Sequence, residues 1–234
     1  MAFHHSPRII TDGLVLSLDA ADKNSYIGSG TAWTDLSGNG NNGTLTNGPT
    51  FDSGHGGSIV FAGDNDVVNF GVASNLFDLD MSEFSIELWF RGNGTTPTTG
   101  TSPRHLGFTY GIRLIPTTTG YSFGVDDTGT STINYISYSD GPNLRDDNSW
   151  HQIVCSNNGT TSYIYQDGVL RASGVAAWTG ETRWPTNPIY LGRDNNNNNY
   201  FFTGKIAIFK VYTKTLSSAE ISQNFNAQRS RFSI

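Results

Sequence analysis

Apolar and polar residues alternate with a period of two along most of the chain, which is the pattern of β-strands with two different faces. The clearest run is residues 84–90, where Phe84, Ile86, Leu88 and Phe90 share one face and Ser85, Glu87 and Trp89 share the other. This run predicts a strand with one face in the core and one in water, with Glu87 as a polar residue on the wet face.

Similar runs predict strands before and after this one. In residues 14–18 the three leucines fall on one face. Residues 204–212 are apolar on both faces, and this pattern predicts a central strand that is buried on both sides. Strict alternation places Ile206 and Ile208 on the same face of that strand. The remaining candidates are residues 59–61, 67–70, 105–110, 111–115, 121–125, 132–138, 150–156, 161–166, 169–171 and 189–192.

Two local signals fix a turn and a helix. Asp167-Gly168 lies between two alternating runs, which predicts a hairpin turn because both positions need positive φ. Residues 217–228 predict the single helix. Ser217 and Glu220 have the spacing of a capping box, and Leu216 and Ile221 that of a hydrophobic staple.

Together these elements predict an all-β fold, a two-sheet antiparallel jelly-roll sandwich with one short C-terminal helix. No segment has the composition of a linker, so residues 12–234 form one domain after an N-terminal arm, residues 1–11. The polar stretches 92–104 and 195–199 are predicted to be loops within that domain.

Composition and charge limit the classes of partner that this 234-residue chain is expected to bind. Its 14 Lys+Arg against 20 Asp+Glu give a formal charge of −6, which argues against a nucleic-acid partner. The one cysteine, Cys155, excludes an intramolecular disulfide and is predicted to be a small core residue. We find neither a signal-peptide core nor a run of about 20 apolar residues, so we expect a protein made in a cytoplasm, with no membrane partner.

Several segments, in order along the chain, resemble one family. They read GLVLSLDAA (13–21), WTDLSGNGNNGT (33–44), SIVFAGDNDVV (58–68), FSIELWF (84–90), WHQIV (150–154), YIYQDG (163–168) and GKIAIF (204–209). They resemble concanavalin A-like, laminin-G-like jelly-roll domains over roughly residues 12–228. The resemblance implies the sandwich fold, with occasional structural calcium at its rim. It leaves the function open, because this sandwich hosts lectins, adhesion modules, hydrolases and structural proteins.

The two ends of the chain, residues 6–14 and 220–227, resemble stand-alone proteins of tailed bacteriophages. In those, such domains sit on virions as head decorations, fibres or tail-associated proteins. This resemblance implies a non-enzymatic structural protein on the virion surface, made in the host cytoplasm, whose partners are other virion proteins. The arm is predicted to contact a neighbouring subunit, as in a homo-oligomer, through Phe3, Ile9 and Ile10.

The acidic residues offer no recognisable catalytic pair. Glycosidase chemistry needs two carboxylates, one on each side of the bond that is cleaved. Hydrolases with this sandwich fold share a strand motif, Glu-x-Asp-x-x-Glu or a similar one. This chain has four glutamates, Glu83, Glu87, Glu181 and Glu220, and they do not form it. We assign no catalytic residue, and no chemistry to His151. A glycoside hydrolase or lyase is therefore the third reading of the function.

Oxygen ligands for a metal are present in one turn. Asp64 and Asp66 are two carboxylates one residue apart, which suits Ca²⁺ if backbone carbonyls complete the shell. The alternative is an ordinary Asx-turn. The pairs 126–127 and 146–147 are weaker versions of the same pattern.

A glycan site is predicted from two loops. Trp178, Arg183 and Trp184 combine aromatic faces for stacking on sugars with a hydrogen-bond donor, and Asn197 and Tyr200 add polar groups from the next loop. They predict a carbohydrate-binding adhesin that recognises host or environmental glycans, the alternative to the virion role. The alternative is that both tryptophans fill one end of the core or lie in an intersubunit contact.

Overall fold

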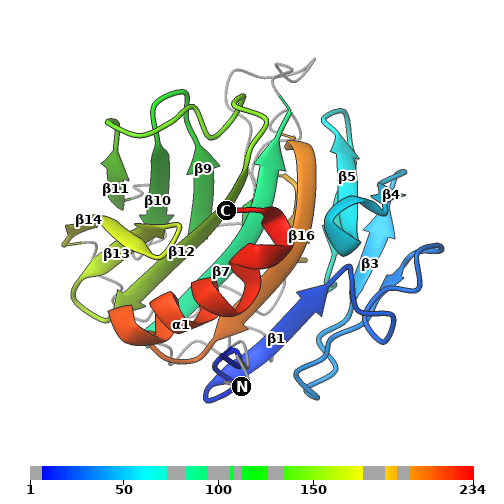
Figure 1. The fold of residues 1–234 in the computed structure, drawn as a ribbon, viewed down its shortest axis with the longest axis horizontal. Helices are drawn as coiled ribbons and strands as arrows, with labels where there is room; N and C mark the ends of the chain where they lie inside the picture. Colours follow the sequence, from blue (N-terminus) through cyan, green and yellow to red (C-terminus); the bar gives the residue numbers. More distant parts are fainter. Residues whose placement is uncertain are drawn as a thin grey trace, which may run out of the picture.

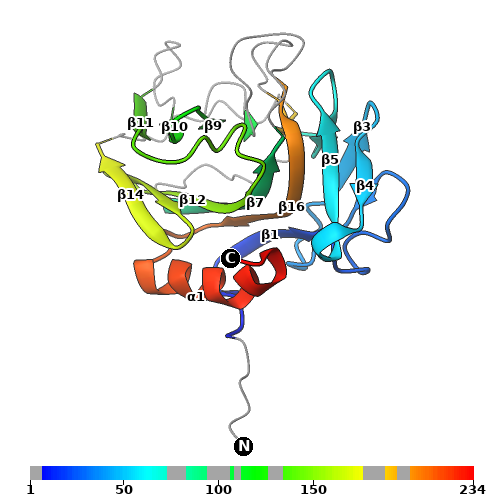
Figure 2. The ribbon, with the colours of Figure 1, turned by 45° about the horizontal axis from the view of Figure 1, so that its top comes forward.

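Two antiparallel β-sheets, packed face to face, make up the protein (Figures 1 and 2). The computed structural model describes residues 7–72, 83–93, 106–107, 112–125, 134–175, 188–193 and 201–234. Each sheet has eight strands, and the strand pairs in this part of the chain are all antiparallel. The arrangement confirms the predicted all-β jelly-roll sandwich.

The first sheet carries the longer strands. They are β1 (Leu14–Asp19), β4 (Thr50–Asp52), β5 (Ser58–Ala62), β7 (Glu83–Gly92), β12 (Trp150–Asn158), β13 (Ser162–Gln166), β14 (Val169–Gly174) and β16 (Thr203–Tyr212). Their order is β14-β13-β12-β7-β16-β5-β4, and β1 pairs with β16. β16 therefore lies inside the sheet, as its two apolar faces predict. The turn between β13 and β14 has positive φ at Asp167 (51°) and Gly168 (78°), which confirms the predicted hairpin.

The second sheet is built from shorter strands. They are β2 (Ala32–Trp33), β3 (Gly43–Thr46), β6 (Val67–Asn69), β8 (Leu106–Gly107), β9 (Ile112–Pro116), β10 (Tyr121–Val125), β11 (Asn134–Tyr138) and β15 (Tyr190–Leu191). Their order is β11-β10-β9-β8-β15-β6-β3-β2.

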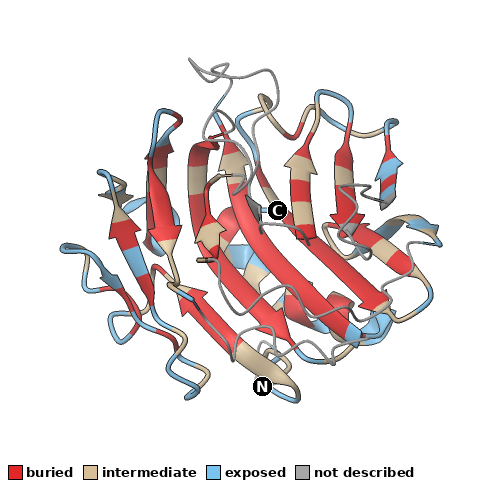
Figure 3. Cartoon of the chain, turned by 180° about the vertical axis from the view of Figure 1, so that it is seen from behind, coloured by how far each residue is buried: buried red, intermediate tan, exposed pale blue. Residues whose placement is uncertain are grey.

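One apolar core joins the two sheets. Phe61, Leu88 and Phe209 from the first sheet belong to the same buried cluster as Leu114 and Phe123 from the second. Cys155 lies in this cluster too, as predicted. Buried residues run along the central strands of the first sheet, and exposure increases toward the edges and loops (Figure 3).

A helix covers the outer face of the first sheet (Figures 1 and 2). α1 (Ser218–Gln228) begins after Ser217, whose side chain accepts from the Glu220 backbone while the Glu220 side chain accepts from the Ser217 backbone, so the capping box is confirmed. Ile221 packs with Leu216, as the staple predicts. The chain then ends in the 3₁₀ turn η2 (Arg229–Phe232).

Two β-bulges change the faces that strict alternation predicts. The register of β16 against β7 shifts between Ile206 and Ile208, and that of β1 against β16 shifts between Leu14 and Leu16. An extra residue turns the side chains that follow to the opposite face. Ile206 and Leu16 therefore lie between the sheets, whereas Ile208 and Leu14 pack on the helix side. The prediction that each pair shares a face is wrong.

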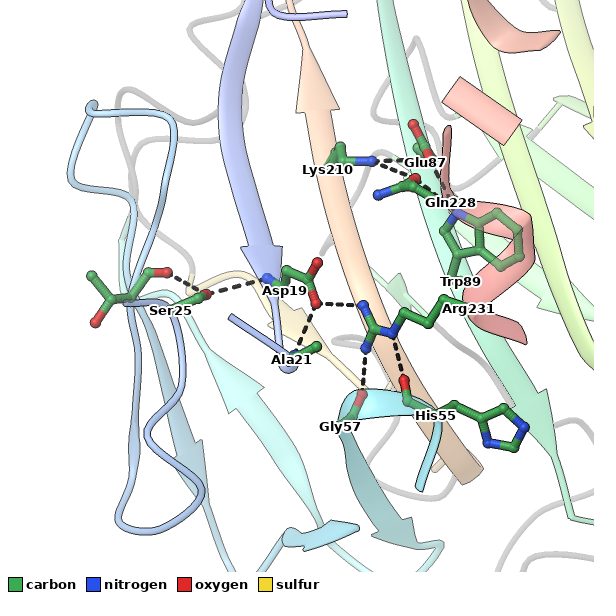
Figure 4. Close-up of polar contacts among 11 residues, drawn as sticks. Asp19, Ala21, Ser25, His55, Gly57, Glu87, Trp89, Lys210, Gln228 and Arg231 are labelled. Atoms are coloured by element: carbon green, nitrogen blue, oxygen red, sulfur yellow. Dashed lines mark hydrogen bonds and ion pairs between the residues drawn. The ribbon is translucent and has the colours of Figure 1, made fainter. Parts of the chain in front are cut away.

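The outer face of β7 is dry, so the prediction that Glu87 lies on a wet face is also wrong. Glu87 and Trp89 are both 0% exposed. Glu87 Oε1 lies 3.1 Å from Lys210 Nζ in β16, and Glu87 Oε2 accepts from Asn224 Nδ2 in α1 at 2.8 Å (Figure 4 shows the Lys210 side). Alternation within β7 cannot reveal that a helix far along the chain will cover it.

Part of the arm binds its own chain. The Ile10 backbone N–H donates to Asn224 Oδ1 at 2.8 Å, and Gln223 Nε2 donates to the Arg8 carbonyl at 2.7 Å. The Ile10 side chain packs on the cluster beneath α1. Ile10 therefore packs within its own chain, contact of the arm with a neighbouring subunit stays a prediction, and Phe3 lies outside the described residues. Within the described chain, none of the helices has the length and apolar character that crossing a bilayer requires.

Candidate functional site

A surface pocket of about 210 Å³ lies where the loop after β1 meets β4 and the short 3₁₀ turn η1 (Gly54–Gly56). Two alanines and the Phe51 ring line it together with Tyr26 and Ile27, and its polar side chains are Lys23 and Ser53. Ile27 is 76% exposed, so an apolar side chain stands at the pocket in contact with water. A concave, mostly apolar surface with a few polar groups is the usual form of a small-ligand site.

Local hydrogen bonds shape the loop wall of this pocket. The Asp22 carbonyl accepts from the backbone N–H groups of Ser25 and Tyr26, both at 2.8 Å, which closes a tight turn. Tyr26 is buried and its hydroxyl donates to the Gly30 carbonyl at 2.8 Å. Its ring centroid lies 5.5 Å from that of Phe51, so the two aromatic residues hold the loop against β4.

An arginine near the C-terminus connects three segments beside the pocket (Figure 4). The Arg231 guanidinium donates to Asp19 Oδ1 and to the carbonyls of His55 and Gly57, each at 2.6 Å. Asp19 Oδ1 also accepts from the Ala21 backbone N–H at 2.9 Å. The guanidinium therefore joins the end of β1, η1 and η2, next to the lining residues Ala20, Ala21 and Gly56.

Gly57 allows the backbone after η1 to lie close to the backbone after β1. Its φ is 146°, and a Cβ on it would lie 2.4 Å from the Ala20 carbonyl oxygen. Any side chain there would push η1 away from the loop after β1. The pocket therefore depends on a glycine at this position.

The electrostatics of the pocket are simple. Burial raises the pKa of Tyr26, so its hydroxyl stays neutral at physiological pH. Lys23 is then the charged group of the lining. Asp52, next to Phe51, pairs with Lys205 and accepts from Gly54, and both contacts lower its pKa. The described lining contains no carboxylate, so the pocket offers binding groups but no acid–base pair.

Comparison with protein families identifies the fold's relatives. Residues 62–222 match the concanavalin A-like lectin/glucanases superfamily. The chain belongs to this superfamily. The resemblance seen in the sequence is therefore confirmed. A comparison with curated proteins finds no match.

Solved structures similar to this concanavalin A-like domain include clostridial binding domains. The receptor-binding domain of botulinum neurotoxin C/D mosaic serotype is 17% identical (TM-score 0.73; 94% of this chain). The binding domain of Paraclostridial Mosquitocidal Protein 1 is 20% identical, with a TM-score of 0.67 over 93% of this chain. A third structure is of botulinum neurotoxin type C, whose cell entry is described as dependent on interaction with two ganglioside molecules. It is 18% identical, with a TM-score of 0.66 over 94% of this chain. The chain spans about half, 52%, of each of these three structures, and such identities show a shared fold.

Within this superfamily, hydrolysis of a glycan requires two carboxylates facing one bond. Glu87 is buried in its ion pair, and Glu220 is held by Ser217 and Lys214. Glu83 is exposed at the start of β7, and Glu181 lies outside the described residues. The described glutamates therefore serve structural contacts or stand apart from one another.

The five predicted glycan-site residues, Trp178, Arg183, Trp184, Asn197 and Tyr200, all lie outside the described residues of the concanavalin A-like domain. Their role stays a prediction. The pocket was missed because its walls, residues 20–28 and 51–56, carry no shared motif. The only sequence signal was an aromatic residue in each, Tyr26 and Phe51.

At the predicted calcium turn, Asp66 Oδ2 accepts from the Ala62 backbone N–H at 2.8 Å, and Asp64 Oδ1 from that of Asn65 at 2.7 Å. Burial raises the pKa of Asp66. In the described part of the chain, no three His, Cys, Asp or Glu side chains come together as metal ligands. The turn thus shows carboxylate-to-amide bonding, as in the Asx-turn alternative, and calcium stays a prediction. The weaker pair 126–127 lies outside the described residues.

A histidine clamp is a second feature that sequence reasoning missed. His151 Nδ1 lies 2.9 Å from Asp167 Oδ2 and its Nε2 lies 2.8 Å from Asp147 Oδ2. The clamp joins β12 to the β13–β14 turn and to the loop before β12. Burial alone would lower the pKa of His151, but the two carboxylates outweigh it and raise the pKa.

This clamp predicts a pH dependence of stability. The charged imidazole stabilises the fold, so its contribution is complete below the unfolded-state pKa of about 6.5 and is lost as pH rises through the higher folded-state pKa. We expect the free energy of unfolding to fall between pH 6 and pH 9 more steeply in the wild type than in His151→Gln. Urea unfolding across this range measures the difference, and parallel curves would contradict the assignment.

Proposed function

We propose that the protein is a non-enzymatic, lectin-like binding module that holds a sugar unit in the pocket beside Phe51. The observation that carries the proposal is the lining itself, which pairs an aromatic ring and the exposed Ile27 with the polar groups of Ser53 and Lys23. Sugars present an apolar C–H face and a rim of hydroxyls, and such a lining meets both.

Membership of a superfamily that includes lectins supports this proposal. So does the fold shared with botulinum neurotoxin type C, which interacts with gangliosides, because gangliosides carry sugars. Neither relative identifies which surface of the fold binds. The lack of a carboxylate in the described lining argues for binding without hydrolysis.

A glycan array tests the proposal with wild-type protein and Phe51→Ala. Removing the ring takes away the stacking surface, and we expect at least a tenfold loss of binding, about 1.4 kcal/mol or more. Because Phe51 is half-buried, Ile27→Ser is the second variant: Ile27 is exposed, so the fold is retained while apolar contact is lost.

The matched control is Leu170→Ser, which changes another exposed apolar residue, on β14. It should bind like the wild type. Wild-type binding by both Phe51→Ala and Ile27→Ser would reject the pocket, and loss of binding in Trp178→Ala and Trp184→Ala alone would assign recognition to the loops predicted from the sequence.

A module of this kind can also be displayed on a bacteriophage particle, as the ends of the sequence predict. The three structural matches do not bear on this placement. Co-purification of the chain with intact virions, at a fixed stoichiometry, would support it.

A further inference from the structure

We infer that the pocket prefers an anionic saccharide, a single sugar ring carrying a carboxylate or sulfate that pairs with Lys23. The inference rests on the proposed function and names its ligand class. It is carried by the charge distribution around the pocket and by its size.

Lys23 is a free cation at the pocket. The described residues form no ion pair with it, and its side chain is exposed. Tyr26, the other titratable residue of the lining, is neutral. A ligand in the pocket therefore meets one full charge, and that charge is positive.

The nearby carboxylates are already engaged. Asp19 accepts from Arg231 and Asp52 pairs with Lys205, so these two negative charges are balanced by cations of their own. The Asp22 carboxylate points to Asn24, accepting from its backbone N–H at 2.8 Å and its side-chain amide at 3.0 Å. Asp22 keeps its negative charge but lies outside the lining and forms no ion pair with Lys23 among the described residues, so within the lining the Lys23 ammonium is the group that attracts an anion.

The size of the pocket limits the ligand to one ring. Sites for drug-sized ligands span about 300–1,000 Å³, whereas this pocket measures about 210 Å³. A terminal sugar fits such a space, with its apolar face on Phe51 and its charged substituent toward Lys23. The chain as a whole carries −6, so a local cation distinguishes this site for anions.

The expected preference is modest because Lys23 is exposed. Exposed ion pairs correspond to about a two- to fivefold change in affinity. Salt screens such a pair, with a Debye length of about 10 Å at 0.1 M, so the preference should shrink as ionic strength rises.

The experiment compares matched sugars by ligand-observed NMR titration at low and high salt. The probes are methyl galactoside, its C6 acid methyl galacturonide, and methyl galactoside 6-sulfate. The wild type should bind both acids two- to fivefold more tightly than the neutral sugar, and Lys23→Gln should bind all three alike. Lys214→Gln removes one positive charge elsewhere on the surface and should keep the preference.

Each outcome decides a separate point. Equal affinities in the wild type, or a preference that survives in Lys23→Gln, would overturn the inference while leaving the proposed function intact. Binding of the carboxylate but not the sulfate, or the reverse, would support it and identify the anion. Failure of the wild type to bind any of the three sugars, while array binding is lost in Phe51→Ala, would overturn the inference alone; failure to bind on the array as well would also overturn the proposed function.

Discussion

Glu87→Ala should lower the free energy of unfolding by about 3–5 kcal/mol, the range expected when one partner of a buried ion pair is removed. Lys210, of which 1% is exposed, would be left charged beneath α1, with Gln228 Oε1 at 2.9 Å as its hydrogen-bond acceptor among the described residues. Trp89 Nε1 and Gln152 Nε2 would lose the same acceptor, Glu87 Oε1. Urea unfolding with two-state analysis measures the change.

The control separates burial from charge. Lys214 is the matched lysine on the surface, where it forms ion pairs with the carboxylates of Asp12 and Glu220. Lys214→Ala should therefore cost less than about 1 kcal/mol. The double variant of Glu87→Ala with Lys210→Met should be less destabilised than the sum of the single changes, because no unpaired charge remains. A loss below about 1 kcal/mol for Glu87→Ala would contradict the buried network.

Trp89→Ala should be comparably damaging, at about 3–5 kcal/mol. Trp89 is fully buried on the outer face of β7, and its ring centroid lies 4.3 Å from that of Phe232 and 5.8 Å from that of Phe225. Phe225 belongs to α1 and Phe232 to η2, so these ring contacts pack both elements against the sheet. Without the indole, a cavity opens beneath both elements.

Trp89→Phe is the matched variant. It keeps an aromatic ring in the stack but removes the Nε1–H that donates to Glu87 and Gln228 at 3.2 and 3.1 Å. Both acceptors keep other donors, since Lys210 still donates to Glu87 Oε1 and to Gln228 Oε1. We therefore expect the change to cost about 1–3 kcal/mol, the range for losing a hydrogen bond to a charged group, and so less than the alanine change. Thermal unfolding followed by circular dichroism ranks the two, and equal losses would indicate that the stack contributes nothing.

Local rules predicted the parts of the fold that depend on neighbours in sequence. The Asp167-Gly168 turn follows from the need for positive φ, and the Ser217–Glu220 capping box from its spacing. The predicted strand at residues 121–125 matches β10 at both ends. These features are decided within a few residues, where sequence patterns are informative.

Features decided by distant contacts were not predicted. Strict alternation placed Ile206 with Ile208, because nothing in the sequence marks the bulge between them. It placed Glu87 in water, because the covering helix lies at the other end of the chain. In both cases tertiary packing decides which face of a strand is wet.

The candidate site belongs to this second group. Its walls come from a loop after β1 and from β4 and η1, and Arg231 near the C-terminus connects these segments. The sequence did indicate a binding role on this fold, through the aromatic residues of two predicted loops. It could not show that Phe51 and Lys23 would line one pocket.

The most direct test of the account is a map of backbone amide chemical shifts while the protein is titrated with the glycan that binds it most tightly on the array. If the pocket is the binding site, the shifts should concentrate at Ala21, Ile27, Gly28, Ser53 and Gly56, which line it. Shifts confined to residues 176–187 and 194–200, or spread evenly over the surface, would contradict the central claim that this pocket recognises sugar.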